Sequence, residues 1–409
     1  MRTVPFARLE PLFQELGPLD RAVLERFLSK ELTEAQFLQA QIKVRNGGLG
    51  YFDTANLQPG AYVSSRVATK ALRARLSGQA VAQMPPDLLL LDHVNRFNAL
   101  IPAAKHLNPT TLNVVKHTQK ALSKIVNKVK LKALRELHKD SPADLTRLRS
   151  CGGKGAGSFL KTPPQPQRSP SILPVHFKTA IKYRLGVNQN EGAVFCNQLH
   201  GGGPVRLDPL GAHAVGCKPG GQVIWRHEQV EAWLIGTGSI SNLRMQRQPH
   251  LMDLIPDATT NRRPDILIHS LNGRDVVTDV TIVEPTHNSN QLNARTVNGF
   301  SANQAESAKI AKYRADLAPR ATFTPFAVET YGTLGDHARD LLWQIARHIS
   351  HHTDVSLPLV KRKLLIELSV IVQRNVAAAI FRRSPASAVF AEGASNSPVR
   401  GQSHRSRRV

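Results

Sequence analysis

The chain has 409 residues, a length typical of two or three domains, and its 41% hydrophobic content is enough for buried cores. Its formal net charge of +24 and pI near 10.5 favour a polyanionic partner, either nucleic acid or an anionic membrane surface. No apolar run approaches the ~18 residues of a membrane-spanning helix, the N-terminus lacks a signal-peptide core, and three scattered cysteines exclude a disulfide framework. We therefore expect a soluble intracellular protein that does not act in a membrane.

Residues 1–103 are expected to form a helical region. Apolar residues recur at helical spacing in segments 19–30 and 33–41. The glycine-rich segment 44–53 lacks the preceding strand and the following Lys-Ser/Thr pair that a phosphate-binding loop needs. We interpret it as a tight packing turn.

Residues 104–150 are predicted to be a basic insert built on an amphipathic helix, with an apolar stripe on one face. On another face, lysines recur at every fourth position: Lys116, Lys120, Lys124, Lys128 and Lys132. Such a ridge suits contacts to successive phosphates, which give salt-dependent and sequence-independent affinity for nucleic acid. The alternative is an ordinary solvated lysine face.

Two segments have the composition of linkers or tails. Residues 151–174 are rich in Gly, Pro and Ser and predict a linker or a disordered insert, so a second domain should begin near residue 175. Residues 383–409 are of low complexity and end basic, which predicts a disordered tail suited to nuclear targeting or nucleic-acid binding. We therefore expect a nuclear location.

The region 175–222 contains a possible metal site. Its pattern is C-x3-H-x12-H-x3-C, formed by Cys196, His200, His213 and Cys217. Structural zinc prefers four Cys or His ligands paired on short turns, and the neighbouring glycines would let the backbone fold tightly around an ion. The alternative is two buried cysteines beside ordinary histidines. His227 is another possible ligand, although it fits better at the start of a helix.

Residues 262–285 predict a β-hairpin that carries two aspartates. Asn272-Gly273 is a strong turn signal between two apolar runs, and it places Asp265 and Asp279 almost opposite one another. Two adjacent carboxylates repel, and one would normally take up a proton unless a divalent cation such as Mg²⁺ relieves the repulsion. The alternative is a surface hairpin with aspartates at its edge.

A strong helix follows at 301–318, with Lys309 and Lys312 on it, and then a strand at 323–332. A cation beside a metal site can stabilise the charge that develops on a phosphate. The order strand, strand, helix, strand, carrying acid, acid and lysine, is the order of a nuclease core.

These motifs together resemble the PD-(D/E)xK restriction-enzyme-like endonuclease at the C-terminus of site-specific non-LTR retrotransposon polyproteins. The matching elements are the Cys/His knuckle, Arg226-His227, Pro264-Asp265, Asp279 and Lys309-x-x-Lys312-Tyr313. Residues 43–65 are similar to the stretch that follows the polymerase thumb in the same proteins. The resemblance covers residues 35–350 apart from the basic insert.

The chain departs from the family pattern in three ways. The knuckle usually opens Cys-x-x-Cys, but position 199 is Leu, so His200 would have to substitute. The usual position of the motif lysine is Thr281, and the family's helical lysine is matched first by Lys309 and second by Lys312. No Tyr-x-Asp-Asp polymerase turn occurs, so the resemblance is to the post-polymerase part alone.

The resemblance implies an α/β fold, with a PD-(D/E)xK core over 223–382 made of a mixed sheet flanked by helices. It implies Mg²⁺-dependent nicking of a DNA target, leaving a 3′-hydroxyl that primes reverse transcription of the element RNA. Asp265 and Asp279 would hold Mg²⁺, and Lys309 would stabilise charge at the scissile phosphate. The residues expected to contact nucleic acid, besides the lysine ridge, are Arg226, His227, Arg262 and Arg263.

Two rival interpretations remain open. The chain could be a non-catalytic nucleic-acid-binding remnant that relies on the knuckle, the lysine ridge and the tail. It could also be a pseudogene product without selected activity. The nuclease interpretation requires Asp265, Asp279 and Lys309 to converge within a few ångströms, whereas the remnant does not.

Overall fold

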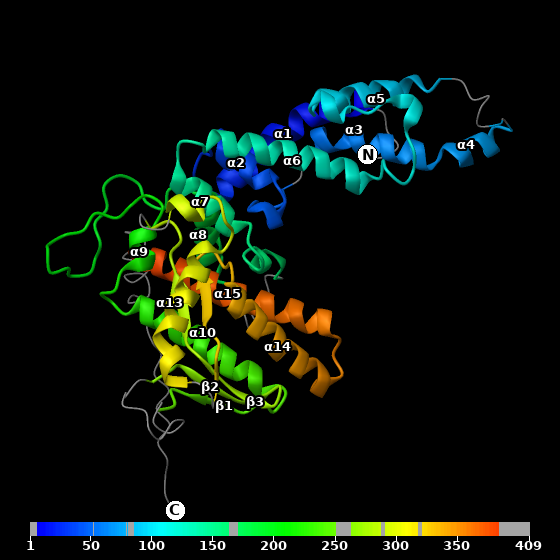
Figure 1. Ribbon diagram of the computed structural model, residues 1–409. Helices are drawn as coiled ribbons and strands as arrows, with labels where there is room; N and C mark the ends of the chain where they lie inside the picture. The colour runs from blue at the N-terminus through cyan, green and yellow to red at the C-terminus, as the bar shows by residue number, and fades with distance from the viewer. Residues whose placement is uncertain are drawn as a thin grey trace, which may run out of the picture.

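The computed structural model describes residues 6–51, 53–78, 80, 86–162, 171–250, 263–287, 291–317 and 321–383. The protein is mixed α/β, about 60% helical with a small mixed sheet, which confirms the predicted class. In Figure 1 the N-terminal helices form an elongated arm, and the strands lie in the body below it with α10, α13, α14 and α15 around them.

Seven α-helices build the N-terminal part: α1 (Phe6–Leu28), α2 (Glu34–Gln41), α3 (Thr54–Ala68), α4 (Lys70–Leu76), α5 (Leu88–Ala99), α6 (Gln119–Leu137) and α7 (Pro142–Cys151). The described residues between them include the 3-10 turns η1 (Val44–Asn46), η3 (Ala103–Lys105) and η4 (Pro109–Thr111). The apolar stripe of α6 packs with α3 and α5 around buried Val63, Phe97 and Leu122. The helix within the predicted basic insert is therefore part of this helical core.

The glycine segment after α2 is a tight turn, as predicted. Gly47 has φ +98°, a left-handed conformation that favours glycine. A side chain at Gly48 would lie 2.1 Å from the carbonyl oxygen of Ile42. These two positions therefore accept glycine alone.

The first part of the predicted linker is instead packed structure. Phe159, in the 3-10 turn η5 (Ser158–Lys161), is 1% exposed. A side chain at Gly153 would lie 1.8 Å from the hydroxyl of Thr333, and one at Gly157 would lie 2.1 Å from Val44. The glycines here permit close approach between segments, so the linker prediction is wrong for residues 151–162. Residues 163–170 lie outside the described part of the chain.

Within the described part of the chain, the strands form one four-stranded and one two-stranded sheet. The members are β1 (Met245–Arg247), β2 (Ile266–Leu271), β3 (Arg274–Thr278), β4 (Val280–Val283), β5 (Thr322–Phe323) and β6 (Phe326–Glu329). The larger sheet has the order β1-β2-β3-β5, with β3 parallel to β5 and the other pairs antiparallel. β4 and β6 pair in parallel. The predicted hairpin turn is confirmed, since Asn272 (φ 55°) and Gly273 (φ 79°) both have the positive φ of a type I′ turn.

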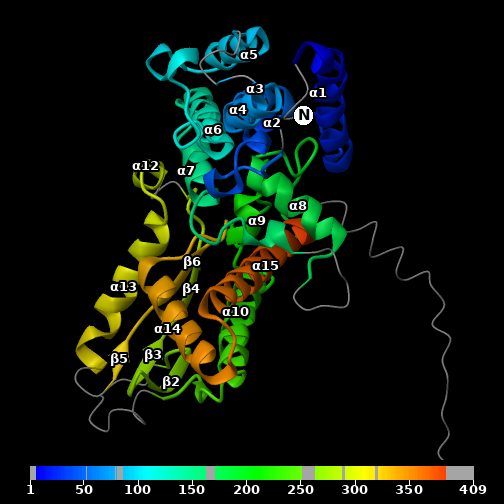
Figure 2. The ribbon, with the colours of Figure 1, turned by 90° about the vertical axis from the view of Figure 1, so that its right-hand side faces the viewer.

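Alternate residues of the strands face two different helical layers. Ile266, Ile268 and Val276 belong to the main core, which includes residues of α10 (Gln222–Ser239) and α14 (Asp336–Thr353). Leu267 and Val277 pack on the other face with Tyr313 of α13 (Phe300–Leu317). Figure 2 shows α13 on one side of the strands and α10 and α15 on the other. The short helix α12 (Gln291–Ala294) precedes α13.

Helix α15 (Leu357–Arg383) crosses the centre of the molecule. It contributes Leu368 and Val372 to the main core, and Val370 and Ala377 to a second core with α1 and α8 (Pro174–Leu185). Among the described residues it is the one helix long and apolar enough to cross a membrane by length and composition, and 67% of that stretch is buried inside the protein. The expectation that no apolar run reaches such a length is therefore wrong. The helix is apolar on several sides because it packs against other helices on several sides. The predicted tail, from residue 384, lies outside the described residues.

Candidate metal and acidic sites

The register of the hairpin places Asp265 directly opposite Asp279. Ile266 pairs with Thr278, so Asp265, which precedes β2, lies opposite Asp279, which follows β3. Both aspartates share the parity of Leu267 and Val277, and they therefore face the α13 side of the sheet. Asp279 lies at the point where the chain leaves β3 and enters β4, so the predicted single strand is divided there.

The acidic pair is held by residues from two helices. The ammonium of Lys309 on α13 lies 2.6 Å from Oδ2 of Asp279. Nε2 of His227 on α10 lies 3.2 Å from Oδ1 of Asp265, whose Oδ2 accepts a 2.6 Å hydrogen bond from the amide of Val280. Asp265, Asp279 and Lys309 thus meet at one place, and His227 joins them there.

The two carboxyl groups have opposite electrostatic environments. Burial and the hydrogen-bonded, negatively charged Asp265 raise the pKa of Asp279 to about 6, against the opposing effect of Lys309. Burial also acts to raise the pKa of Asp265, but hydrogen bonds from His227, Asp279 and the Val280 amide outweigh it and the pKa falls below its usual value. The hydrogen bond to Asp265 in turn raises the pKa of His227. The pair therefore shares a proton at mildly acidic pH.

Lys309 is the lysine that contacts the pair. Lys312 lies three residues further along the helix, is exposed, and has its ammonium 5.0 Å from the ring centre of Tyr313. Thr281 shares the strand parity of Asp279, and its hydroxyl is buried without a hydrogen-bond partner among the described residues. On the face of the sheet where the PD-(D/E)xK motif has its lysine, this chain has Thr281, and Lys309 from helix α13 reaches that face instead.

The arginines near this site that were predicted to contact nucleic acid differ in their exposure. Arg226 is 3% exposed, and its Nη1 donates a 3.2 Å hydrogen bond to the carbonyl oxygen of Val215. The prediction that Arg226 contacts DNA is therefore corrected, because its guanidinium has no access to the surface. Arg263 is exposed beside Asp265. Arg262 lies outside the described residues.

The five lysines of the predicted ridge are all exposed: Lys116, Lys120, Lys124, Lys128 and Lys132. Lys116 lies in the turn before α6, and the other four are on the helix. Lys130 faces inward instead, where its ammonium pairs with Asp53. Burial, and then the charges of Arg45, Lys120 and Lys124, lower the pKa of Lys43.

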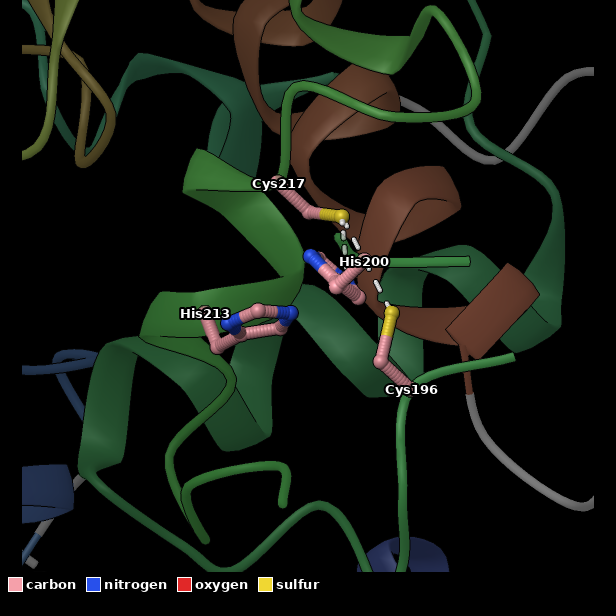
Figure 3. Close-up of side chains that lie close together, drawn as sticks. All are labelled: Cys196, His200, His213 and Cys217. Carbon is pink, nitrogen blue, oxygen red and sulfur yellow. Dashed lines mark hydrogen bonds between the residues drawn. The ribbon is translucent and has the colours of Figure 1, made fainter. Parts of the chain in front are cut away.

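The second site is a cluster of two cysteines and two histidines. One ligand atom from each of Cys196, His200, His213 and Cys217 lies within 4.8 Å of the others. The two sulfurs are 3.8 Å apart, and the Cys217 sulfur is also 3.8 Å from Nε2 of His200. Figure 3 shows the four side chains turned toward a common centre. All three cysteines of the chain are free thiols.

Local backbone hydrogen bonds bring these four residues together. The amide of Cys196 donates to the carbonyl of Val205, which closes a short loop that carries His200. His213 lies on the five-residue helix α9 (Ala212–Gly216), whose first amides donate to the carboxylate of Asp208. The sequence pattern therefore becomes two short turns that face each other.

The cluster fits a metal ion by its chemistry as well as its spacing. Nε2 of His213 is buried with no hydrogen-bond partner among the described residues, as expected of an atom that serves as a ligand. Leu199, at the position where the resembled family has cysteine, is 96% exposed and is not part of the cluster, so His200 would supply the remaining ligand atom. His227 belongs to the acidic site and is not part of this cluster. The four residues could therefore hold a metal ion.

Sequence reasoning missed Glu329, which positions the helix that carries Lys309. Its carboxylate accepts hydrogen bonds from the hydroxyl of Ser150 (2.5 Å) and from the first amides of α13, those of Ser301 (3.2 Å) and Ala302 (3.4 Å). Burial raises its pKa to about 7, against the opposing effect of these hydrogen bonds. The available signal was an acid at the end of the apolar strand FAVE, where a free charge is costly.

No protein-family model and no curated protein matches this chain. Its function must therefore be inferred from the geometry of these two sites.

Proposed function

We propose that the protein is a Mg²⁺-dependent DNA endonuclease of the PD-(D/E)xK type, derived from the post-polymerase part of a non-LTR retrotransposon protein. The observation that carries the proposal is the meeting of Asp265, Asp279 and Lys309. A surface hairpin with edge aspartates would give no reason for a lysine from a separate helix to join two buried carboxyl groups. A non-catalytic remnant would not require this convergence either.

The order of the elements also supports the proposal. α10 is followed by the antiparallel strands β1, β2 and β3, and then by α13 and a strand parallel to β3. Asp265 lies just before β2, Asp279 lies just after β3, and Lys309 lies on the later helix α13. This is the order of acid, acid and lysine that the family resemblance implies for a nuclease core.

Each side chain has a defined task in the proposed reaction. Asp265 and Asp279 present oxygen ligands of the kind that Mg²⁺ prefers, and one proton would leave the pair when the ion binds. When bound, Mg²⁺ supplies Lewis-acid polarisation of the phosphodiester and activation of water. Lys309 then directs its charge to the scissile phosphate, while His227 holds the orientation of Asp265.

We propose that the Cys/His cluster holds zinc in a structural role. Zinc–sulfur distances of about 2.3 Å in a tetrahedral site put two thiolate sulfurs roughly 3.8 Å apart. The observed separation of the cysteine sulfurs is 3.8 Å. Four protein ligands leave no open position for substrate, which favours a structural ion.

The proposed partners are a DNA target and the RNA of the element, in the nucleus. The net charge of +24 and the exposed lysine ridge on α6 favour a phosphate backbone as partner. The ridge is on α6 in the helical arm, and β2 and β3, which flank the acidic pair, lie in the body (Figure 1), so this basic surface is apart from the proposed cleavage site.

A nicking assay tests the proposal. Purified protein is incubated with supercoiled plasmid, with and without Mg²⁺, and the open-circular product is measured. We expect Mg²⁺-dependent nicking that Asp265→Ala and Asp279→Ala abolish without loss of DNA binding, whereas Lys312→Ala keeps the wild-type rate. Nicking by Asp279→Ala at the wild-type rate would sink the assignment.

A further inference from the structure

A basic hollow lies on the molecule apart from both sites described above. It has a volume of about 340 Å³ and is formed by the loop at 154, η5, α14 and the beginning of α15. Four of its lining residues are cations: Lys154, Lys161, Lys361 and Arg362. The aromatic ring of Trp343 also lines it.

The positive charge of this hollow is not compensated within the protein. No aspartate or glutamate is among its lining residues. Among the described residues, none of the four cations makes an ion pair with a carboxylate. By contrast, Lys363 lies on the same helix outside the hollow and is 3.9 Å from Glu367. Four cations gathered without an acid form a site for an anion.

Two of these cations converge on one indole ring. The ammonium of Lys154 lies 5.1 Å from the ring centre of Trp343, and that of Lys361 lies 5.0 Å from it. Each contact is favourable to the ring face, but the two ammonium groups repel one another. A bound anion would relieve that repulsion and draw the two ammonium groups away from the ring of Trp343. A base stacked on that ring would then gain more free energy than an exposed cation–π contact provides.

We propose that this hollow binds single-stranded nucleic acid, with a base on Trp343 and the flanking phosphates on Lys154, Lys161, Lys361 and Arg362. The combination of cations with an aromatic ring is the chemistry of single-strand binding, because only an unpaired base exposes its face for stacking. A volume of about 340 Å³ suits one nucleotide unit. A membrane surface would need no concave site with an aromatic floor.

The hollow is separate from the proposed cleavage site. Trp343 and Leu365 pack against the main core, on the side of the sheet that α10, α14 and α15 cover. Asp265 and Asp279 face α13 on the other side. The binding inference therefore does not depend on the cleavage chemistry, and it can be tested without Mg²⁺.

The test is binding of a fluorescent twelve-nucleotide oligo(dT) to the full chain in a buffer with EDTA. We expect Lys361→Glu and Trp343→Ala each to weaken binding at least fivefold, and Trp343→Phe to retain most of it. The matched control Lys363→Glu makes the same charge change on the same helix outside the hollow, and we expect less than a twofold effect. Melting temperatures check that each variant is folded.

Three results would overturn the proposal. The first is equal weakening by Lys361→Glu and Lys363→Glu, which would make the binding a matter of net charge. The second is an unchanged affinity in folded Trp343→Ala, or in Lys154→Glu together with Lys361→Glu if the tryptophan variant does not fold. The third is binding to phosphatidylserine vesicles that requires Trp343 while oligo(dT) binding does not.

Discussion

Lys309 on α13 places a positive charge beside Asp279, whereas the strand that follows Asp279 has the uncharged Thr281. Thr281 follows Asp279 by two residues and lies on the same face, where its hydroxyl has no hydrogen-bond partner among the described residues. The Lys309 ammonium is 2.6 Å from Asp279. In the proposed reaction the position of the positive charge is what matters, so a lysine at either position would supply it.

A lysine transplant follows from this arrangement. We expect Lys309→Ala to lower the nicking rate roughly 10²-fold, as loss of a transition-state charge partner does. Adding Thr281→Lys should restore part of the rate, since it places an ammonium on the same face. Single-turnover nicking measures both. A wild-type rate in Lys309→Ala, with Lys312→Ala as the control, would remove Lys309 from the site.

The raised pKa of Asp279 has a consequence for stability. Its pKa is about 6 in the folded protein against an ordinary 3.8, because burial and Asp265 disfavour the charge. The folded state therefore binds the proton more tightly, and stability falls as pH rises from about 4 to 6 and stays lower above that.

Asp279→Asn should consequently stabilise the metal-free protein at pH 8. The amide mimics the protonated carboxyl, and we expect a gain on the order of 1–3 kcal/mol. At pH 4 the variant and the wild type should unfold at the same denaturant concentration. Urea unfolding in EDTA at the two pH values measures this, and an equal effect at both would contradict the shared-proton account.

At the residue level, the approximate opposition of the two aspartates could be predicted from the turn at Asn272-Gly273, but their exact pairing could not. A regular two-residue turn would pair Asp265 with Val280, but the register shifts between Ile268 and Leu271 and brings Asp265 opposite Asp279 instead. The Arg226 prediction failed for a reason of helix geometry. Adjacent residues on a helix point about 100° apart, so His227 faces the site while Arg226 turns into the core.

At the scale of elements, buried carboxylates replace ordinary caps at two helices. Glu329 accepts from the first amides of α13, and Glu306 accepts from His337 and Ala338 at the start of α14. Both satisfy amides that a helix N-terminus leaves unpaired. Glu329 thereby fixes the helix that presents Lys309.

Glu329→Ala should therefore weaken both stability and nicking. It leaves buried amides and the Ser150 hydroxyl without their acceptor, at a cost of about 1–3 kcal/mol. Glu329→Gln keeps an acceptor oxygen and should be closer to the wild type. Urea unfolding and nicking rates compare the two variants, and identical behaviour of Ala and Gln would contradict the capping role.

Some elements were predictable and others were not. The α13 helix and the hairpin have clear periodicity or turn signals. Strand β1 has three residues, too few to show a period. Helix α15 is apolar on several sides and therefore lacks the periodicity that marks an amphipathic helix. Composition alone could not show that Gly153 and Gly157 serve close packing rather than flexibility.

At the scale of the whole molecule, buried Arg184 and helix α15 join the helical arm to the body. Arg184 donates to the carbonyl oxygens of Val44, Gly48 and Cys151, which belong to separate segments. The last residue of α15, Arg383, donates a 2.8 Å hydrogen bond to the carbonyl of Pro219 beside the Cys/His cluster. The cluster is thus tied to the helix on which the two largest cores pack.

Removal of the proposed zinc ion should accordingly destabilise the whole protein. We expect a zinc chelator, or Cys217→Ser, to lower the melting temperature by several degrees, because a structural ion contributes directly to folding. Cys151→Ser, at a buried thiol outside the cluster, is the control for metal content. Metal analysis accompanies the melting curves, and full metal content in Cys217→Ser would contradict the assigned ligands.

The central claim is that Asp265 and Asp279 hold one divalent ion beside Lys309. Electron paramagnetic resonance of free Mn²⁺, an ion that suits the same oxygen ligands as Mg²⁺, measures this directly in the complex of the full chain with duplex DNA. We expect one ion per wild-type chain beyond that held by DNA alone, the same in Lys312→Ala, and none in Asp279→Asn. An ion retained by Asp279→Asn, or no additional ion in the wild type, would contradict the claim.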